Sequence, residues 1–400
     1  MFSNIFNIIQ APLFNILFLV AVAWSVAIFL ERFRIPLIIG ELVAGIIIGP
    51  AVLGIIHPSP EIDILASLGM FFLMFHSGLE TDPRFIRKTL RPSVWIGLSG
   101  ISFPFLLGTG STLLFGGSLI QAVLIGAAVS GTSMVTKSRI LCDLQLDRSR
   151  IGYQMMGAAI FDNITIFLII SLIIKSTQNG GFSLSDALMT TLEILIFFAI
   201  TLTAGYLLFP KLSRYFTTRR GKGFTFALLM GFIFAFLAEA IRLPFILGAY
   251  IAGLFVREEI MSASLFQKMH DRFLAISHGF LGPIFIMSIA LKINLNVVVK
   301  QFWFVAVLFL VAFSGKLLGV YLGGRASGSS SNESLIMGLA MNGRGEIELI
   351  IALIGLQLGI INEDLMSVLV VVAFATTLCA PLILNKYMLK CPPKLALIED

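Results

Sequence analysis

Apolar stretches close to the length that crosses a bilayer as a helix recur along the chain, separated by short polar connections. One crossing needs about 20 such residues. The pattern predicts an all-α polytopic membrane protein with 13 transmembrane helices. The predicted spans are residues 11–30, 36–53, 62–78, 93–115, 119–138, 151–174, 184–209, 222–240, 243–256, 273–291, 302–323, 333–356 and 364–385. The second and the ninth span are short and start at or beside a proline, which favours a broken or tilted helix.

Basic residues are distributed unevenly between the predicted spans. Connections after odd-numbered spans carry 22 Lys and Arg residues, Lys137 among them, whereas connections after even-numbered spans carry 4. Because Lys and Arg collect in cytoplasmic loops, we expect the N-terminus to lie outside the cell and the C-terminus in the cytoplasm. The expected location is the cell inner (plasma) membrane. Lys316 and Arg344 remain and lie inside predicted spans. No basic residue precedes the first span, so we expect that span to be retained rather than cleaved as a signal peptide.

A weak internal repeat relates the two halves of the chain. The pattern E-x-x-R-x-P-x-I-x-G at residues 31–40 recurs at residues 239–248. Span 2 thus corresponds to span 9, and because seven crossings separate them, the second copy is inverted. Inverted repeats are typical of secondary transporters, which bind their substrate near the midplane where broken helices meet. We predict one membrane transport domain, 1–400, with a first repeat at 11–174, a linker helix at 184–209, a second repeat at 222–385 and a short cytoplasmic tail at 386–400.

The composition excludes several classes of protein. Hydrophobic residues make up 58% of the chain and charged residues only 12%, which leaves no soluble domain large enough for an enzyme and no nucleic-acid surface. We therefore expect no enzymatic activity and the lipid bilayer as a partner. The 3 cysteines and 4 histidines follow no metal-binding spacing, and no cofactor is expected. The net charge of +6 is interpreted as a basic cytoplasmic rim.

The most informative polar residue is Asp162, which lies midway along a predicted span. Its charge must be partnered, protonated or met by a cation, as a carrier that exchanges protons for cations requires. Asn163, Thr132 and Ser133 add hard oxygen ligands suited to Na⁺. We predict these four residues as a cation and proton site, with a metal-ligand set of Asp162, Asn163 and Thr132 for Na⁺ or K⁺. The alternative is a purely structural Asp162 whose charge is neutralised permanently by a buried lysine. Separately, we expect Lys316 to form an ion pair with Asp162.

Two predicted spans carry Gly with small polar residues at equivalent places of the two repeats. These are Ser130-Gly131-Thr132-Ser133 and Asn342-Gly343-Arg344-Gly345. Such runs favour unwound segments whose helix ends face an ion, although glycines also permit close helix packing. Arg344 is expected to pair with Glu346 or with freed carbonyl groups.

The chain resembles the bacterial monovalent cation/proton antiporter superfamily, in the branch of sodium/proton antiporters and glutathione-gated potassium efflux systems. The similarity covers essentially the whole chain. It rests on the motifs RIPLIIGELVAGIIIGP, FFLMFHSGLETD, GTSMV, GAAIFDN, SGKLLGVYLGGR and MNGRGEIELIIALIGL.

The resemblance implies a homodimer that works by an elevator-like movement. Spans 4–6 and 11–13 are expected to form a core with two crossed discontinuous helices, and spans 1–3 and 8–10 a dimerisation part. It also implies that Thr132 lies near the cation and that Lys316 pairs with the first residue of the acidic pair. The charges expected to hold the core together are Lys316, Arg325, Arg344, Glu346 and Glu348.

One position departs from the family pattern. The family usually has Asp-Asp, Asn-Asp or Gln-Asp in the sixth span, whereas this chain has Asp162-Asn163. One residue turns a side chain by about 100° around a helix, so Asp162 is not equivalent to the missing second acid. Three interpretations are open: Asp162 binds the ion in competition with Lys316, Glu346 or Glu348 supplies the charge, or antiport has been lost.

The predicted function is secondary exchange of a monovalent cation for protons, with Na⁺ first and K⁺ or Li⁺ as further candidates. With one carboxylate, an electroneutral exchange of one cation for one proton is the simplest cycle. The alternative is electrogenic exchange, in which Lys316 also releases its proton during the cycle. The alternatives are a potassium efflux or K⁺:H⁺ antiport module, whose regulatory subunit would be a separate protein, and a non-transporting membrane sensor or scaffold.

Overall fold

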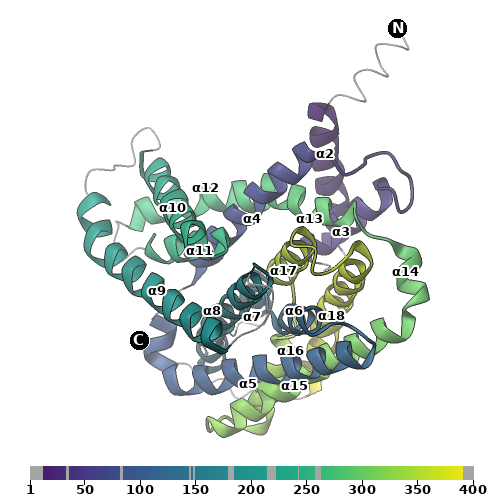
Figure 1. The fold of residues 1–400 in the computed structure, drawn as a ribbon. Helices are drawn as coiled ribbons and strands as arrows, with labels where there is room; N and C mark the ends of the chain where they lie inside the picture. The colour runs from purple at the N-terminus through teal and green to yellow at the C-terminus, as the bar shows by residue number, and fades with distance from the viewer. Residues whose placement is uncertain are drawn as a thin grey trace. The chain divides into compact units, whose positions relative to one another are not determined.

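The computed structural model of the chain is built from helices (Figure 1). It describes residues 12–32, 36–81, 84–143, 146, 149–178, 184–213, 222–241, 243–256 and 263–390. Among them, 8 helices are long and apolar enough to cross a membrane. They are α2 (Pro12–Glu31), α4 (Pro60–Glu80), α5 (Arg84–Leu114), α8 (Arg150–Gln178), α10 (Lys222–Ala240), the continuous run of α12 (Ala263–Ile276), η2 (Ser277–Leu281) and α13 (Gly282–Ala290), α15 (Phe302–Ala326) and α18 (Glu363–Lys390). The all-α, multi-span architecture is confirmed.

The remaining described helices are mostly shorter. They are α3 (Leu37–Ile48), α6 (Leu119–Ser130), α7 (Met134–Asp143), α9 (Leu184–Ser213), α11 (Phe245–Phe255), α14 (Leu295–Lys300), α16 (Ser331–Ala340) and α17 (Glu346–Gln357). The second predicted span ends early, at Ile48, because Pro50 lacks the N–H that would continue the helix and disfavours helical geometry at Gly49. The last helix is longer than predicted, and α18 includes the first residues of the expected tail.

Contacts divide the chain into two compact units, each drawn from both halves of the sequence. Unit 1 contains Met1–Leu79, Thr203–Phe236 and Gly248–Asn296. Unit 2 contains Glu80–Leu202, Leu237–Leu247 and Val297–Asp400. Apart from the junctions, predicted spans 1–3 and 8–10 thus fall in unit 1, and spans 4–6 and 11–13 in unit 2.

Unit 1 is packed through apolar and aromatic contacts between α4, α11 and α12. A Cβ atom on Gly78 would lie only 2.1 Å from the carbonyl oxygen of Tyr250, so α4 and α11 approach at backbone distance. Phe75 of α4 stacks on Phe273 of α12, with ring centroids 4.3 Å apart. These contacts exclude side chains larger than glycine at the crossing and tie three segments of distant sequence into one unit.

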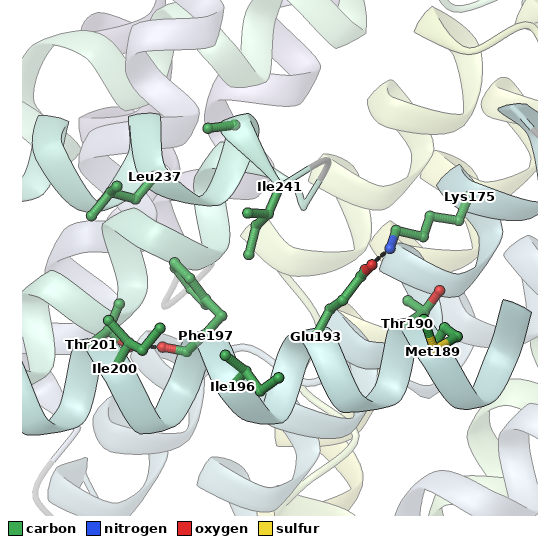
Figure 2. Close-up of a pocket in the computed structure, with 11 residues that line it drawn as sticks. Lys175, Met189, Thr190, Glu193, Ile196, Phe197, Ile200, Thr201, Leu237 and Ile241 are labelled. Atoms are coloured by element: carbon green, nitrogen blue, oxygen red, sulfur yellow. Dashed lines mark hydrogen bonds and ion pairs between the residues drawn. The ribbon is translucent and has the colours of Figure 1, made fainter.

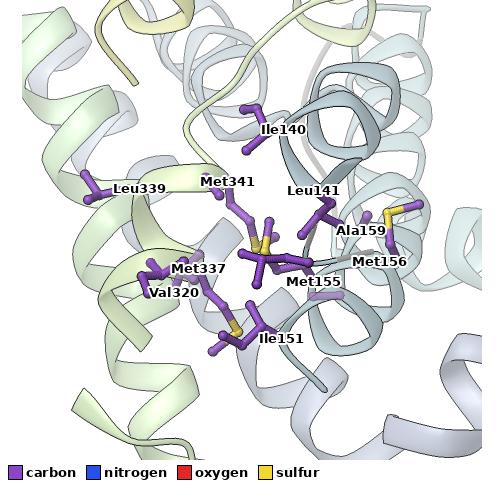
Figure 3. Packing of buried hydrophobic residues seen from close by; sticks show 14 of the residues in the cluster. Ile140, Leu141, Ile151, Met155, Met156, Ala159, Val320, Met337, Leu339 and Met341 are labelled. Atoms are coloured by element: carbon purple, nitrogen blue, oxygen red, sulfur yellow. The ribbon is translucent and has the colours of Figure 1, made fainter. Parts of the chain in front are cut away.

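Unit 2 surrounds its short helices with long ones. The helices α5 and α15 lie side by side (Figure 1), and a Cβ atom on Gly319 would lie 2.3 Å from the carbonyl oxygen of Ser99. Apolar side chains of α7, α8 and α16, together with Met341 directly after α16, interdigitate in a buried cluster that is rich in methionine. Met155, Met337 and Met341 are fully enclosed in it (Figure 3). This packing holds the ends of α7 and α16 in place beside the polar residues described next.

Candidate functional site

Two interrupted helices meet inside unit 2. The first interruption separates α6 from α7 at residues 131–133, and the second separates α16 from α17 at residues 341–345. The backbone N–H of Ser133 donates a hydrogen bond to the carbonyl oxygen of Gly343 at 3.2 Å. The discontinuous helices predicted from the two glycine-containing runs are therefore present, and their interruptions are directly bonded. The unpaired peptide groups of four helix ends gather at this point.

Asp162 on α8 is fully buried beside the first interruption. Its Oδ2 atom accepts hydrogen bonds from Lys316 Nζ at 3.0 Å and from Thr132 Oγ1 at 3.2 Å. Lys316 Nζ also donates to the carbonyl oxygen of Ser130 at 3.0 Å. The structure contains the Lys316–Asp162 ion pair expected from the sequence. The lysine thus neutralises both the carboxylate and the negative C-terminal end of α6.

Lys137 is a second lysine at the same carboxylate, and the sequence analysis missed it. Its Nζ atom lies 3.8 Å from Asp162 Oδ2, and both side chains are 0% exposed. The assignment of Lys137 to a cytoplasmic connection was wrong, because the chain resumes as α7 at Met134 and carries Lys137 in its first turn. The position of Lys137 within the predicted span 119–138, one helical turn beyond Ser133, was the available signal.

The other two predicted ligands do not contact Asp162. Ser133 Oγ donates to Glu346 Oε2 at 2.7 Å. Asn163 is buried, and its side-chain amide forms no hydrogen bond with any described residue. The four expected ligands therefore do not surround one site: Thr132 is hydrogen-bonded to Asp162, and Ser133 is hydrogen-bonded to Glu346.

Arg344 lies in the second interruption, and its side chain contacts two neighbouring helices. Its NH1 atom lies 3.5 Å from Glu348 Oε2, and both side chains are buried. Its NH2 atom donates to the carbonyl oxygen of Ala312 at 3.1 Å. Both expected partners are therefore wrong: the acid beside Arg344 is Glu348 rather than Glu346, and the carbonyl group belongs to the middle of α15 rather than to an interruption. Arg344 precedes α17, which begins at Glu346, and the intervening Gly345 is extended, with φ −178° and ψ −130°. The path of the chain at the interruption, rather than helical spacing, therefore sets which acid Arg344 meets.

Arg325 does not join these buried charges. It is exposed at the C-terminal end of α15, where its NH1 atom donates to the carbonyl oxygen of Ser329 at 2.9 Å. A cation in the last turn of α15 is favourable for the helix dipole, and Arg325 is not the core charge that was expected.

Several buried polar atoms at the crossing lack a hydrogen-bond partner within the described part of the chain. They are Asp162 Oδ1, Glu346 Oε1, Lys137 Nζ and both polar atoms of the Asn163 amide. Buried polar atoms are normally satisfied by protein, water or an ion. The available oxygens are carboxylate and amide oxygens, which are hard ligands for a small cation.

Comparison with known proteins identifies the family of the chain. A family model described as "Sodium/hydrogen exchanger, transmembrane" matches residues 16–390. The chain belongs to this sodium/hydrogen exchanger family. Its relatives include the Na(+)/H(+)-K(+) antiporter GerN of Bacillus cereus, 31% identical over 86% of this chain and 88% of that protein. The Na(+)/H(+) antiporter of Enterococcus hirae is 30% identical over 94% of this chain and 98% of that protein.

A solved structure shares the fold of this exchanger-family chain. The sodium proton antiporter MjNhaP1 from Methanocaldococcus jannaschii superposes with a TM-score of 0.71, covering 93% of this chain and 95% of that one. The sequence identity is 17%, so this similarity describes the fold alone.

Two further features of the exchanger-family chain lie outside the predicted site residues. A cavity of about 580 Å³ in unit 2 is lined mainly by apolar side chains of α9 and the end of α10, and the ion pair of Lys175 with Glu193 lies on its wall (Figure 2).

In unit 1, the His76 ring lies 5.2 Å from that of His270 and 4.9 Å from that of His278. The sequence spacing gave no sign of this histidine group, because its members come from α4, α12 and η2.

Proposed function

We propose that this protein is a secondary antiporter that exchanges a monovalent cation, with Na⁺ preferred, for protons, and that Asp162 binds the cation and the proton in turn. The observation that carries the proposal is the fully buried Asp162 carboxylate at the interruption of α6 and α7, with one oxygen unpaired among the described residues. The printed names of the relatives agree with this class of transport.

The chemistry follows from one carboxylate with three competing partners. A proton, a transported cation and the Lys316 ammonium each neutralise Asp162, and burial makes an uncompensated charge costly. The Thr132 hydroxyl donates to Oδ2, the oxygen that also accepts the Lys316 ammonium. When one cation replaces one proton, the charge of the site does not change, so the simplest cycle is electroneutral.

The larger architecture is part of the same proposal. The division into two units supports a moving core of predicted spans 4–6 and 11–13 and a dimerisation part of spans 1–3 and 8–10, in a homodimer that works by an elevator-like movement. We retain 13 crossings, two inverted repeats, an inner-membrane location with the C-terminus in the cytoplasm, and a separate regulatory subunit as expectations of this proposal.

Transport in liposomes tests the proposal. Purified protein is reconstituted with an internal pH dye and challenged with Na⁺, Li⁺ or K⁺ from pH 6 to pH 9. We expect a cation-driven pH change in the wild type, its loss in Asp162→Asn, and no loss in Asp271→Asn, which makes the same change at an exposed residue. A wild type without any cation-driven pH change would contradict antiport. Activity that survives Asp162→Asn and disappears with Glu346→Gln would move the ion site to Glu346.

The same assay addresses the alternatives. A response to K⁺ that exceeds the response to Na⁺ favours a K⁺:H⁺ antiport module. A non-transporting sensor or scaffold is favoured by one observation, the two lysines that face the single carboxylate Asp162. That function predicts a folded wild type with no response to any of the three cations.

A further inference from the structure

Lys137 is enclosed in unit 2 without a hydrogen-bond acceptor in the described part of the chain. Its nearest acid is Asp162, whose Oδ2 atom is 3.8 Å away and already accepts hydrogen bonds from Lys316 and Thr132. The charged groups that act on Lys137 are Asp162 on α8, Lys316 on α15 and Glu346 at the start of α17. Two buried ammonium groups thus share one carboxylate, and Asp162 alone does not compensate both charges.

The two lysines at Asp162 are held differently. Lys316 donates to two acceptors, Asp162 Oδ2 and the Ser130 carbonyl oxygen, which fixes its ammonium in place. Lys137 Nζ makes no hydrogen bond with any residue that the structure describes, and its side chain is a flexible four-carbon stem. Lys137 is therefore the cation at this carboxylate that is free to change partner.

A second acceptor for Lys137 is available at the other interruption. Glu346 Oε2 accepts the Ser133 hydroxyl, whereas Oε1 has no hydrogen-bond partner among described residues. Lys137 and Ser133 lie one turn apart at the start of α7, so the ammonium and the Glu346 carboxylate attract one another across the joined interruptions.

We propose that Lys137 is a tethered cation that occupies the cation side of Asp162 when the carrier is empty and turns to Glu346 when a transported cation binds. An ammonium and a monovalent metal ion carry the same charge, so one replaces the other at Asp162 without adding uncompensated charge there. Lys137 is then a specificity-determining residue, because only a cation that binds Asp162 better than the ammonium displaces it. This inference rests on the proposed antiport.

Equilibrium binding of radioactive Na⁺ to the purified full-length protein tests the inference. Lys137→Met removes the competing charge, and we expect it to tighten Na⁺ binding about tenfold, within the usual coupling of neighbouring charged groups. Glu346→Gln removes the alternative partner and is expected to weaken binding. In the double variant the Glu346→Gln effect should disappear, because there is no ammonium left to redirect.

Two controls keep the outcomes distinct. Lys268→Met makes the same change at an exposed lysine of α12 and should bind as the wild type does. Lys137→Gln repeats the test with a polar side chain, and thermal unfolding reports whether each variant is folded. If Na⁺ binding is unchanged or weaker in both folded Lys137 variants, the inference is overturned while antiport stands. The same holds if Glu346→Gln weakens Na⁺ binding as much in the double variant as it does alone. A wild type that neither binds nor transports a cation would overturn the proposed function and the inference with it.

Discussion

The two interruptions of unit 2 handle buried charge in opposite ways. At the first, between α6 and α7, the acid Asp162 comes from α8 and one of its lysines from α15, so the ion pairs join separate helices. At the second, Arg344 and Glu348 belong to the same segment, four residues apart. Thr377 of α18 also holds the Arg344 backbone: its hydroxyl accepts the Arg344 N–H at 3.1 Å and lies 3.0 Å from the Arg344 carbonyl oxygen.

This difference separates a charge that can be exchanged from one that is built in. The Asp162 carboxylate has several competing cations and an unpaired oxygen within the described residues. Arg344 is clamped through its side chain and through its backbone. Lysine can also be buried as a neutral amine when its partner is lost, whereas a guanidinium stays charged. We therefore expect the Arg344–Glu348 pair of the second interruption to serve stability and Asp162 at the first to serve the ion.

The largest effect on stability is expected from Glu348→Gln. This change leaves the Arg344 guanidinium buried without its acid, and breaking a buried pair by removing one partner costs about 3–5 kcal/mol. Thermal unfolding of the purified protein in detergent measures the loss. Glu333→Gln is the matched control, because Glu333 caps the exposed start of α16 and glutamine preserves that cap. Equal stability of the two variants would contradict the clamp.

A smaller effect is expected from Thr377→Val, which keeps the shape of the side chain and removes its hydroxyl. The buried N–H of Arg344 then loses its acceptor, at a cost of about 1–3 kcal/mol. Transport per folded molecule should change little, since Thr377 makes no contact with Asp162 in the described structure. Unfolding and liposome assays on the same preparation measure both quantities. A variant of normal stability and strongly reduced transport would reverse the roles of the two interruptions.

The sequence predicted the all-α, multi-span fold and both interruptions, because apolar length and Gly beside small polar residues are local signals. It also predicted the Lys316–Asp162 pair through the correspondence of the two repeats. It missed Lys137, because a count of loop charges treats a span as continuous, and only the position where α7 resumes brings this lysine inside. The partner of Arg344 was assigned wrongly for a similar reason: Arg344 lies outside α17, before the extended Gly345, so spacing along the sequence does not show which acid it meets.

Ser133→Ala probes the joint between the two interruptions. The Ser133 hydroxyl accepts the Thr136 N–H at 3.1 Å, as a helix N-cap does, and donates to Glu346. Losing an N-cap costs about 1 kcal/mol, and losing the bond to a charged group adds to that. Ser118→Ala removes the N-cap of α6, which touches no buried acid. We expect Ser133→Ala to unfold at a lower temperature than Ser118→Ala, and equal midpoints would contradict a stabilising bond to Glu346.

The smallest effect on stability is expected from Thr132→Val, which repeats at the first interruption the change made at Thr377 in the second. Asp162 Oδ2 keeps the Lys316 bond when the Thr132 hydroxyl is lost, so stability should fall by about 1 kcal/mol or less. The hydroxyl lies beside the proposed cation position, so Na⁺ binding should weaken several-fold while the binding of Thr377→Val stays unchanged. The Thr→Val change is therefore expected to lower mainly stability at the second interruption and mainly Na⁺ affinity at the first. If both variants lose stability alone, Thr132 is a structural residue and the first interruption resembles the second.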